Sequence, residues 1–233
     1  MQDEVTKHTK KMYDAAKNPK HTFGEKIREI IIEIFIIVFA VTLSIWLHGW
    51  SEHRHQQSET KEFLADLKED LNNDIKSMGV ANEALSKSAG SFLFLSRLTK
   101  DRLDSLRDAK SPLNFYSNLG TTKINSGNYE GFKSSGKIGF LENKKLKKLI
   151  LKYYQDAAPN VLEVEKINAS LLMKILDYWA ENSDQDVRKR ILSPKLKTLI
   201  GTFQGTAKSS LDLYQEAIEL AREVISEIDK ESN

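Results

Sequence analysis

The longest apolar run of the chain lies close to its N-terminus. Residues 30–47 read IIIEIFIIVFAVTLSIWL and contain one ionisable residue, Glu33. A helix of this length rises roughly 27 Å, which is enough to cross the hydrocarbon core of a bilayer. Trp46 and Trp50 stand at the C-terminal end of the run, where amphipathic rings favour the headgroup level. The pattern predicts a transmembrane helix over residues 30–50, with these two tryptophans as interfacial anchors.

Beyond residue 50, apolar residues recur in steps of three and four, which is the period of amphipathic helices. No segment shows the strict alternation of a half-buried strand. Glycines interrupt the helical pattern in two places. A bend or a break of the helix is predicted between Gly79 and Gly90, and Gly201 and Gly205 are predicted to separate a short helix from the last one.

The whole pattern predicts an all-α protein. We expect a single N-terminal transmembrane helix that continues into a stalk and an extracytoplasmic antiparallel helical bundle. Residues 111–141 hold five of the eleven glycines, which predicts a loop-rich insert. The predicted organisation is a cytoplasmic tail (1–29), the transmembrane helix (30–50), the stalk and first bundle helices (51–110), the insert (111–141) and the remaining bundle helices (142–233).

Positive charge predicts the orientation of the membrane helix. The fifteen residues before residue 30 contain Lys17, Lys20, Lys26 and Arg28, whereas the fifteen after Trp50 contain only two basic residues. Lysine and arginine are enriched on the cytoplasmic side of membrane helices. We therefore expect the N-terminus in the cytoplasm and most of the chain outside it.

One face of the predicted membrane helix carries polar and small residues. At 100° per residue, Glu29, Glu33, Ile37, Ala40 and Ser44 fall together, and we name them the contact face. Small residues allow close approach of helices, so we predict that this face contacts another membrane helix. Glu33 has an alternative reading, because it lies less than one turn inside the apolar run and its carboxylate can reach the cytoplasmic interface.

Composition narrows the function classes. The chain has 35 Lys+Arg against 33 Asp+Glu, a net charge of +2, which excludes a polybasic nucleic-acid arm, and we expect no nucleic-acid partner. It has no cysteine, which excludes a thiolate nucleophile and cysteine-ligated metals. All five histidines lie in the first 55 residues, so the predicted bundle lacks a histidine base. We expect no enzymatic activity, no cofactor and no metal.

Two segments resemble functional motifs without meeting their requirements. Residues 131–138 read GFKSSGKI, but a phosphate-binding loop needs a hydroxyl for Mg²⁺ where Ile138 stands. His48, Glu52 and His55 share one helical face, but a di-iron site needs a second Glu-x-x-His pair and further carboxylates. Solvated histidines beside the membrane are favoured there, and an intermolecular metal clip stays open.

Two further polar patterns have ordinary structural readings. Asp66, Asp70 and Asp74 form an acidic ridge four residues apart, which predicts a solvated helix face. The triplet Asn168-Ala169-Ser170 fits a glycosylation sequon but lies inside a predicted helix.

Charge is segregated along the second half of the chain. Residues 123–152 hold eight lysines against two glutamates, and residues 211–233 hold seven acids against two basic residues. The favoured reading is that the basic helix packs beside the acidic one, with both faces solvated. The alternative is an anion-binding face for lipid headgroups, an envelope polyanion or an acidic partner, made of Lys144, Lys145, Lys147 and Lys148.

Two stretches resemble a family of bacterial single-pass membrane proteins that is known only as a domain of unknown function. The first stretch reads EIIIEIFIIVFAVTLSIWLHGWSEHRHQ and runs into FLADLKEDLNNDI. The second reads YEGFKSSGKIGFLENKKLKKLILKYYQ and is the more specific. Its motif residues here are Phe132, Ser134, Ser135, Gly136, Ile138, Leu141, Asn143, Tyr153 and Tyr154. The resemblance implies an anchored helical architecture in a bacterial inner membrane, with a periplasmic domain, and it assigns no activity.

Ser134, Ser135 and Gly136 also have a direct physical reading as a turn that tolerates a left-handed backbone, and Asn143 as the N-cap of a helix. From these observations we expect a non-enzymatic interaction or scaffold protein, an accessory subunit of a membrane complex. Its expected partners are membrane lipid and other membrane subunits or a second copy of itself. The alternative is a sensor that binds a ligand in its helical bundle and signals through a membrane partner.

Overall fold

The computed structural model describes residues 2–17, 23–108 and 115–231. Every regular element in these ranges is helical, which confirms the all-α prediction for this part of the chain. The elements are α1 (Gln2–Lys17), α2 (Phe23–Ser96), α3 (Lys100–Asp108), α4 (Gly127–Ser134), the 3₁₀ turn η1 (Lys137–Phe140), α5 (Lys144–Lys152), the π turn η2 (Tyr153–Ala157), α6 (Ala158–Glu181), α7 (Val187–Leu192) and α8 (Pro194–Glu231).

The chain divides into two compact units, Met1–Glu59 and Thr60–Asn233. We call them the N-terminal unit and the C-terminal unit and describe each by itself. The N-terminal unit contains α1 and the first part of α2. The C-terminal unit contains the rest of α2 and all the elements that follow it.

The predicted interruptions at glycines are wrong as breaks, because helix continues through both places. α2 passes Gly79 and Gly90, and α8 passes Gly201 and Gly205. All four glycines are exposed, and a glycine inside a helix costs only about 1 kcal/mol relative to alanine. Burial of one large apolar side chain stabilises the folded state by about 1.5–3 kcal/mol. Neighbouring buried side chains therefore hold both helices together, namely Met78, Leu85 and Phe92 in α2 and Ile200, Phe203 and Ala207 in α8.

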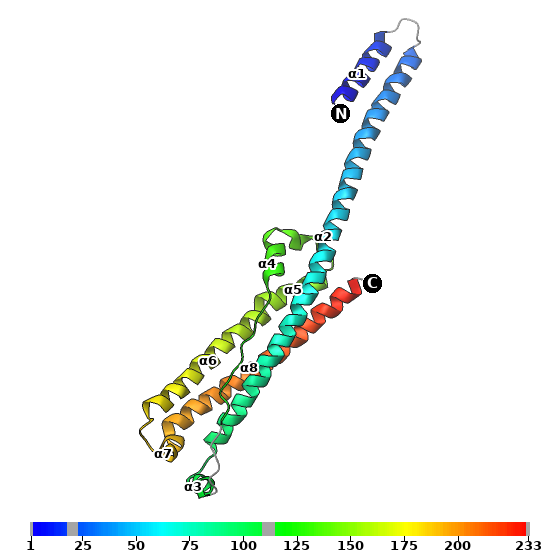
Figure 1. Cartoon of the computed structure of the whole chain (residues 1–233). Coiled ribbons are helices and arrows are strands. Elements are labelled where there is room, and N and C mark those ends of the chain that lie inside the picture. The colour runs from blue at the N-terminus through cyan, green and yellow to red at the C-terminus, as the bar shows by residue number, and fades with distance from the viewer. Residues whose placement is uncertain (1, 18–22, 109–114, 232–233) are drawn as a thin grey trace. The chain divides into compact units, whose positions relative to one another are not determined.

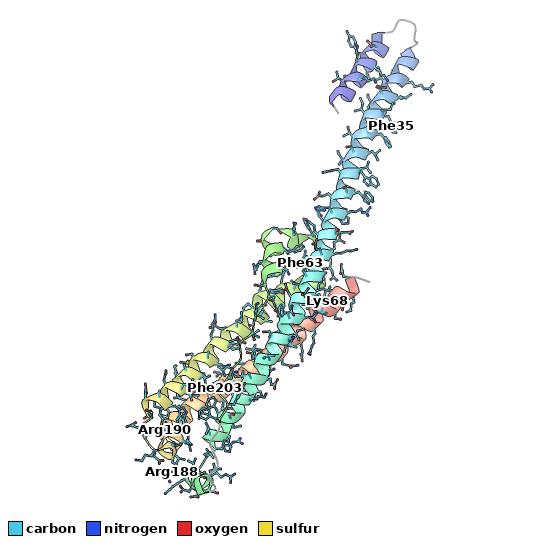
Figure 2. The ribbon with its side chains drawn as sticks, viewed as in Figure 1. Phe35, Phe63, Lys68, Arg188, Arg190 and Phe203 are labelled. Atoms are coloured by element: carbon cyan, nitrogen blue, oxygen red, sulfur yellow. The ribbon has the colours of Figure 1, made fainter. Side chains whose placement is uncertain are left out.

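The C-terminal unit is built around one apolar core. Helices α6 and α8 pack against each other in this core and run in opposite directions (Figure 1). The second part of α2 contributes Leu67 and Phe92, which are fully buried. The ring of Phe92 meets the ring of Phe203, labelled in Figure 2, edge to face at 5.2 Å. The core thus joins segments that lie more than one hundred residues apart.

A segment without regular secondary structure, residues 115–126, runs along α2 between α3 and α4, and we name it the strap (Figure 1). As residue numbers rise along the strap, the residue numbers of its partners on α2 fall, so the two run antiparallel. The contacts in order are Tyr116 N–H to Ser91 Oγ, Ser88 Oγ–H to the Asn118 carbonyl, Lys123 N–H to Ser77 Oγ and Asn125 N–H to Asp74 Oδ1. Side chains of α2 thereby satisfy strap backbone groups that lie outside any helix or sheet.

Gly120 lets the strap approach α2 closely. Its φ is +67°, a backbone conformation that favours glycine. A Cβ atom at this position would lie 3.0 Å from the Cα of Ala81 and 3.2 Å from the Cβ of Ala84. Within the range 111–141, for which the sequence predicts a loop-rich insert, the structure thus describes an ordered strap, α4 and η1.

Candidate functional site

The apolar side chains of the N-terminal unit are exposed. Among the described residues, α2 is the one helix that is long and apolar enough to cross a membrane, and none of its most apolar window is buried. Phe35, labelled in Figure 2, is 67% exposed, and Ile45 is 68% exposed. Trp46 and Trp50, the predicted anchors, are also exposed, and the Arg54 guanidinium lies 4.9 Å from the centroid of the Trp50 ring.

The contact face is partly covered within this unit. Glu33 and Ile37 are half-buried, and they are the least exposed side chains between residues 31 and 50. Ala40 and Ser44 are exposed. The side chain of Glu29 lies outside the described residues. The prediction that this face contacts another membrane helix stays a prediction.

Asp74 corrects the prediction of a solvated acidic ridge. Its side chain is fully buried, and its carboxylate accepts three hydrogen bonds of 2.8 Å, from Tyr153 Oη and from the backbone and side-chain amides of Asn125. Burial raises the pKa of Asp74, and the bonds from Asn125 and Tyr153 oppose that rise. Asp70 is half-buried and accepts a bond from Asn128. The ridge is an attachment line for the strap and the start of α4, and only Asp66 is exposed.

Two neighbouring tyrosines complete this cluster. Tyr153 donates to Asp74, while Tyr154 donates to the carbonyl of Asn125 at 3.2 Å. Consecutive side chains of a helix point about 100° apart, so the pair reaches both the strap and α2. Burial, followed by the charge of Asp74, raises the pKa of both tyrosines. The cluster keeps its phenols protonated as donors and has a structural role.

The glycine-containing turn at residues 131–138 is also structural. Gly136 has a φ of +77°, as expected for a left-handed turn, and it connects α4 to η1. The ring of Phe132 stacks on Phe63 with centroids 3.8 Å apart. Asn143 caps α5 and accepts from the backbone N–H groups of residues 145 and 146, which confirms the predicted N-cap. These contacts explain the motif without a bound phosphate.

The basic helix α5 lies beside the acidic C-terminal part of α8. Lys145 Nζ donates to Glu227 Oε2 at 2.9 Å and lies 3.9 Å from Glu223. The hydrogen bond from Lys145 is the main cause that lowers the pKa of Glu227 to about 2. Lys147 Nζ donates to the carbonyl of Gly139 at 3.4 Å, and Lys144 and Lys148 are exposed. The favoured packing of the basic helix against the acidic one is therefore present, and anion binding by the lysines stays untested.

The histidine motif and the sequon form no functional site among the described residues. His48, Glu52 and His55 are exposed, and His55 lies 3.6 Å from Glu59. Among the described residues no group of three or more His, Cys, Asp or Glu is arranged to hold a metal ion. Asn168 of the sequon is 2% exposed and donates to Ser210 Oγ at 2.7 Å, so its amide is not accessible for glycosylation.

A pocket of about 340 Å³ lies in the C-terminal unit between the strap, α6 and α8. Its apolar wall includes Leu85 of α2, Leu119 of the strap and Leu162 of α6. Its polar groups come from Glu165, Lys166 and Asn168 of α6, Tyr214 of α8, and Thr121 and Thr122 of the strap. An apolar pocket in which a few polar groups converge is typical of a small-molecule site.

Glu165 is the charged group of this pocket. Its Oε1 accepts hydrogen bonds from the Tyr214 hydroxyl at 2.5 Å and from both the hydroxyl and the backbone N–H of Thr122. Its Oε2 accepts only the longer Thr122 N–H bond of 3.2 Å from the described residues. Burial, and then the bond to Glu165, raises the pKa of Tyr214. The carboxylate therefore holds the strap against α6 and α8 and keeps one oxygen with spare capacity.

A model of a family of unknown function, DUF6090, matches residues 33–169, which is more than half of the chain. The chain belongs to DUF6090. No curated protein and no solved structure matches it. Membership confirms the resemblance to an uncharacterised family.

In this DUF6090 member the matched region includes most of the apolar segment, the strap, the Asp74 cluster and every residue of the pocket lining except Tyr214. Tyr214 and Glu227 lie beyond it. Sequence reasoning missed the pocket. A signal was present, because Glu165 and Asn168 interrupt a stripe of buried residues on α6 formed by Val161, Leu172 and Ile175.

Proposed function

We propose that the chain is a single-pass membrane protein whose residues 30–50 cross the bilayer and whose C-terminal unit forms an antiparallel helical bundle outside the cytoplasm. The exposure of the apolar segment carries this proposal, since none of its most apolar window is buried. Exposed apolar surface costs about 25 cal/mol per Å² in water, and a bilayer removes this cost.

A cleaved signal sequence is the competing explanation for such a helix. The family match begins at residue 33, inside the apolar run, so the family includes this segment. His48, Gly49 and Trp50 follow the run, where a cleavage site would need small residues. Both observations support a retained anchor. The excess of lysine and arginine before residue 30 supports a cytoplasmic N-terminus and a C-terminal unit in the periplasm of a bacterial inner membrane.

Single cysteines test this topology cleanly, because the natural chain has none. We would place them at Lys10, Phe35 and Lys208 and treat intact spheroplasts with a membrane-impermeant maleimide. The proposal requires labelling at position 208 only, labelling at position 10 after lysis, and none at position 35. Labelling at position 10 before lysis would contradict the orientation, and recovery of the protein in the carbonate-soluble fraction would contradict the anchor.

For activity, we propose a non-enzymatic interaction or scaffold role, as an accessory subunit of an inner-membrane complex. The contact face supports it, because exposed Ala40 and Ser44 allow close approach of a second helix. Cysteine crosslinking in native membranes from position 40 should exceed crosslinking from Thr42. Equal yields would rule out a specific face. The mass of the protein extracted in mild detergent should exceed that of one chain, and a lone monomer would contradict an accessory subunit.

A second candidate is a periplasmic sensor that binds a ligand in the bundle and signals through a membrane partner. The pocket beside Glu165 favours this candidate, because a scaffold needs no internal pocket. Binding of a small molecule to the pocket that changes crosslinking at position 40 would support it. Ligand binding without any effect on that crosslink would leave the scaffold as the better proposal.

A further inference from the structure

Asn168, which lines the pocket beside Glu165, has an unsatisfied acceptor. The side chain is 2% exposed, and its Oδ1 has no hydrogen-bond partner. The orientation of the amide follows from its neighbour. The Ser210 hydroxyl donates to the carbonyl of Thr206 at 2.8 Å, so its oxygen can only accept from the Asn168 side chain. Asn168 Nδ2 is therefore the atom that faces Ser210, and Asn168 Oδ1 is left without a partner.

An unpaired buried oxygen is costly, since a buried polar group without a partner loses its hydration and gains nothing in return. The group that fits Asn168 Oδ1 must be a hydrogen-bond donor. Residues 165 and 168 are three apart on α6, so their side chains lie on neighbouring positions of one helix face. Both line the same pocket.

The charged groups of the pocket indicate which kind of hydrogen-bond donor a ligand would carry. Lys166 also lines the pocket, but its ammonium lies 3.7 Å from Glu163, and no ion pair joins Glu165 to a cation among the described residues. Tyr214 donates its only proton to Glu165 and keeps a lone pair. Three residues that line the pocket each keep an acceptor with spare capacity: Glu165 at Oε2, Asn168 at its buried Oδ1 and Tyr214 at Oη. A primary ammonium group carries three N–H donors and one positive charge, which matches this set.

We propose that this pocket binds a primary ammonium group carried on a small apolar body. The body would lie against Leu85, Leu119 and Leu162, and a volume of about 340 Å³ limits it to the size of one ring with a short chain. The inference is independent of the membrane anchor. It deepens the sensor candidate by naming the class of its ligand.

The test is isothermal titration of the full-length protein in lipid nanodiscs with three probes of one shape. These are 2-phenylethylamine, the neutral 2-phenylethanol and the anionic 3-phenylpropanoate, with empty nanodiscs as the blank for partition into lipid. The amine should bind saturably at one site, at least about tenfold more tightly than the alcohol, because a charge-assisted hydrogen bond is lost in the neutral probe. The anion should not bind.

Variants locate the site. Glu165→Gln should weaken amine binding about tenfold and leave alcohol binding unchanged. The matched control is Glu163→Gln, the same substitution on an exposed residue of α6 outside the pocket lining, which should bind the amine as the natural protein does. Ala169→Phe should block both probes, since Ala169 lines the pocket and is itself exposed, so the change removes no buried contact.

Three results would overturn the inference. These are no saturable amine binding, equal affinity for amine and alcohol, and equal loss in Glu163→Gln and Glu165→Gln. Thermal unfolding of each variant identifies one that fails to fold, and Ala169→Phe then decides the location alone. Failure of the membrane topology test would leave these outcomes unchanged, so the two proposals can fail separately.

Discussion

Replacing Tyr153 by phenylalanine tests the structural role of the buried Asp74 cluster. The substitution removes one hydroxyl and keeps the ring, so the carboxylate of Asp74 loses a 2.8 Å hydrogen bond at a site where both side chains are fully buried. A hydrogen bond to a charged group contributes about 1.5–3 kcal/mol, and we expect Tyr153→Phe to lower the free energy of unfolding by about 2 kcal/mol at pH 7. Tyr154→Phe is the matched control. It removes a neutral 3.2 Å bond to a carbonyl and should cost about 1 kcal/mol.

The pH dependence of this difference makes the test specific. The folded pKa of Asp74 is raised above its ordinary value of 3.8, so its contribution to stability falls as pH rises from 3.8 through the folded pKa. The bond from Tyr153 lowers the folded pKa, and its removal raises that pKa further. The variant therefore loses more stability than the natural protein as pH rises, and the cost at pH 4 should be about 1 kcal/mol.

Urea unfolding followed by Trp179 fluorescence measures these values in a Trp46→Phe, Trp50→Phe background, because Trp179 is then the only tryptophan and packs against the core of the C-terminal unit. Equal costs for Tyr153→Phe and Tyr154→Phe, or a cost for Tyr153→Phe that does not change between pH 4 and pH 7, would refute an ionised Asp74 held by this phenol.

Three further predictions concern other parts of the C-terminal unit, each read from the same unfolding curves. Gly120→Ala should lower the free energy of unfolding by about 2–3 kcal/mol, because the new side chain needs a left-handed backbone and its Cβ would lie 3.0 Å from the Ala81 backbone. Gly136→Ala also needs a left-handed backbone but has open space around it, so it should lower the free energy of unfolding by only about 1 kcal/mol. Equal costs would show that the strap can move away from α2. The pKa of Glu227 is lowered to about 2, so its stabilising contribution is complete above pH 4.5 and is lost as pH falls towards 2. Lys145→Gln should shift this acid transition to higher pH, and an unchanged transition would exclude the pair as its origin. Phe132→Ala should cost about 3–5 kcal/mol through the loss of its stack on Phe63, and a cost below about 1 kcal/mol would mean that α4 does not depend on this contact.

The helical class and the N-cap at Asn143 could be predicted because each depends on residues close together in the sequence. The apolar periodicity of α2, α6 and α8 repeats within one or two turns, and Asn143 acts on N–H groups two and three residues away. The same local reasoning failed at Gly79 and Gly201. There the local cost of glycine is outweighed by core contacts with helices that are distant in the sequence.

The burial of Asp74 could not be predicted from the residues near it in the sequence. Asp66, Asp70 and Asp74 look alike as a ridge of one helix, but Asn125 and Tyr153, which bury Asp74, lie 51 and 79 residues away. The pocket has the same origin, since its walls come from α2, the strap, α6 and α8. Polar residues at core positions, such as Asn168 in the stripe of α6, are the sequence signal for such long-range partners.

The strap has an unusual consequence for how this chain can change during evolution. In a helix or a sheet, backbone groups bond to other backbone groups, and most side chains can be exchanged without losing those bonds. Here, hydroxyls and a carboxylate of α2 hold the strap backbone, at Ser77, Ser88, Ser91 and Asp74. Tolerance to substitution is therefore inverted. Exposed side chains of the irregular strap, such as Lys123, can be substituted freely, while small polar residues on a regular helix are constrained.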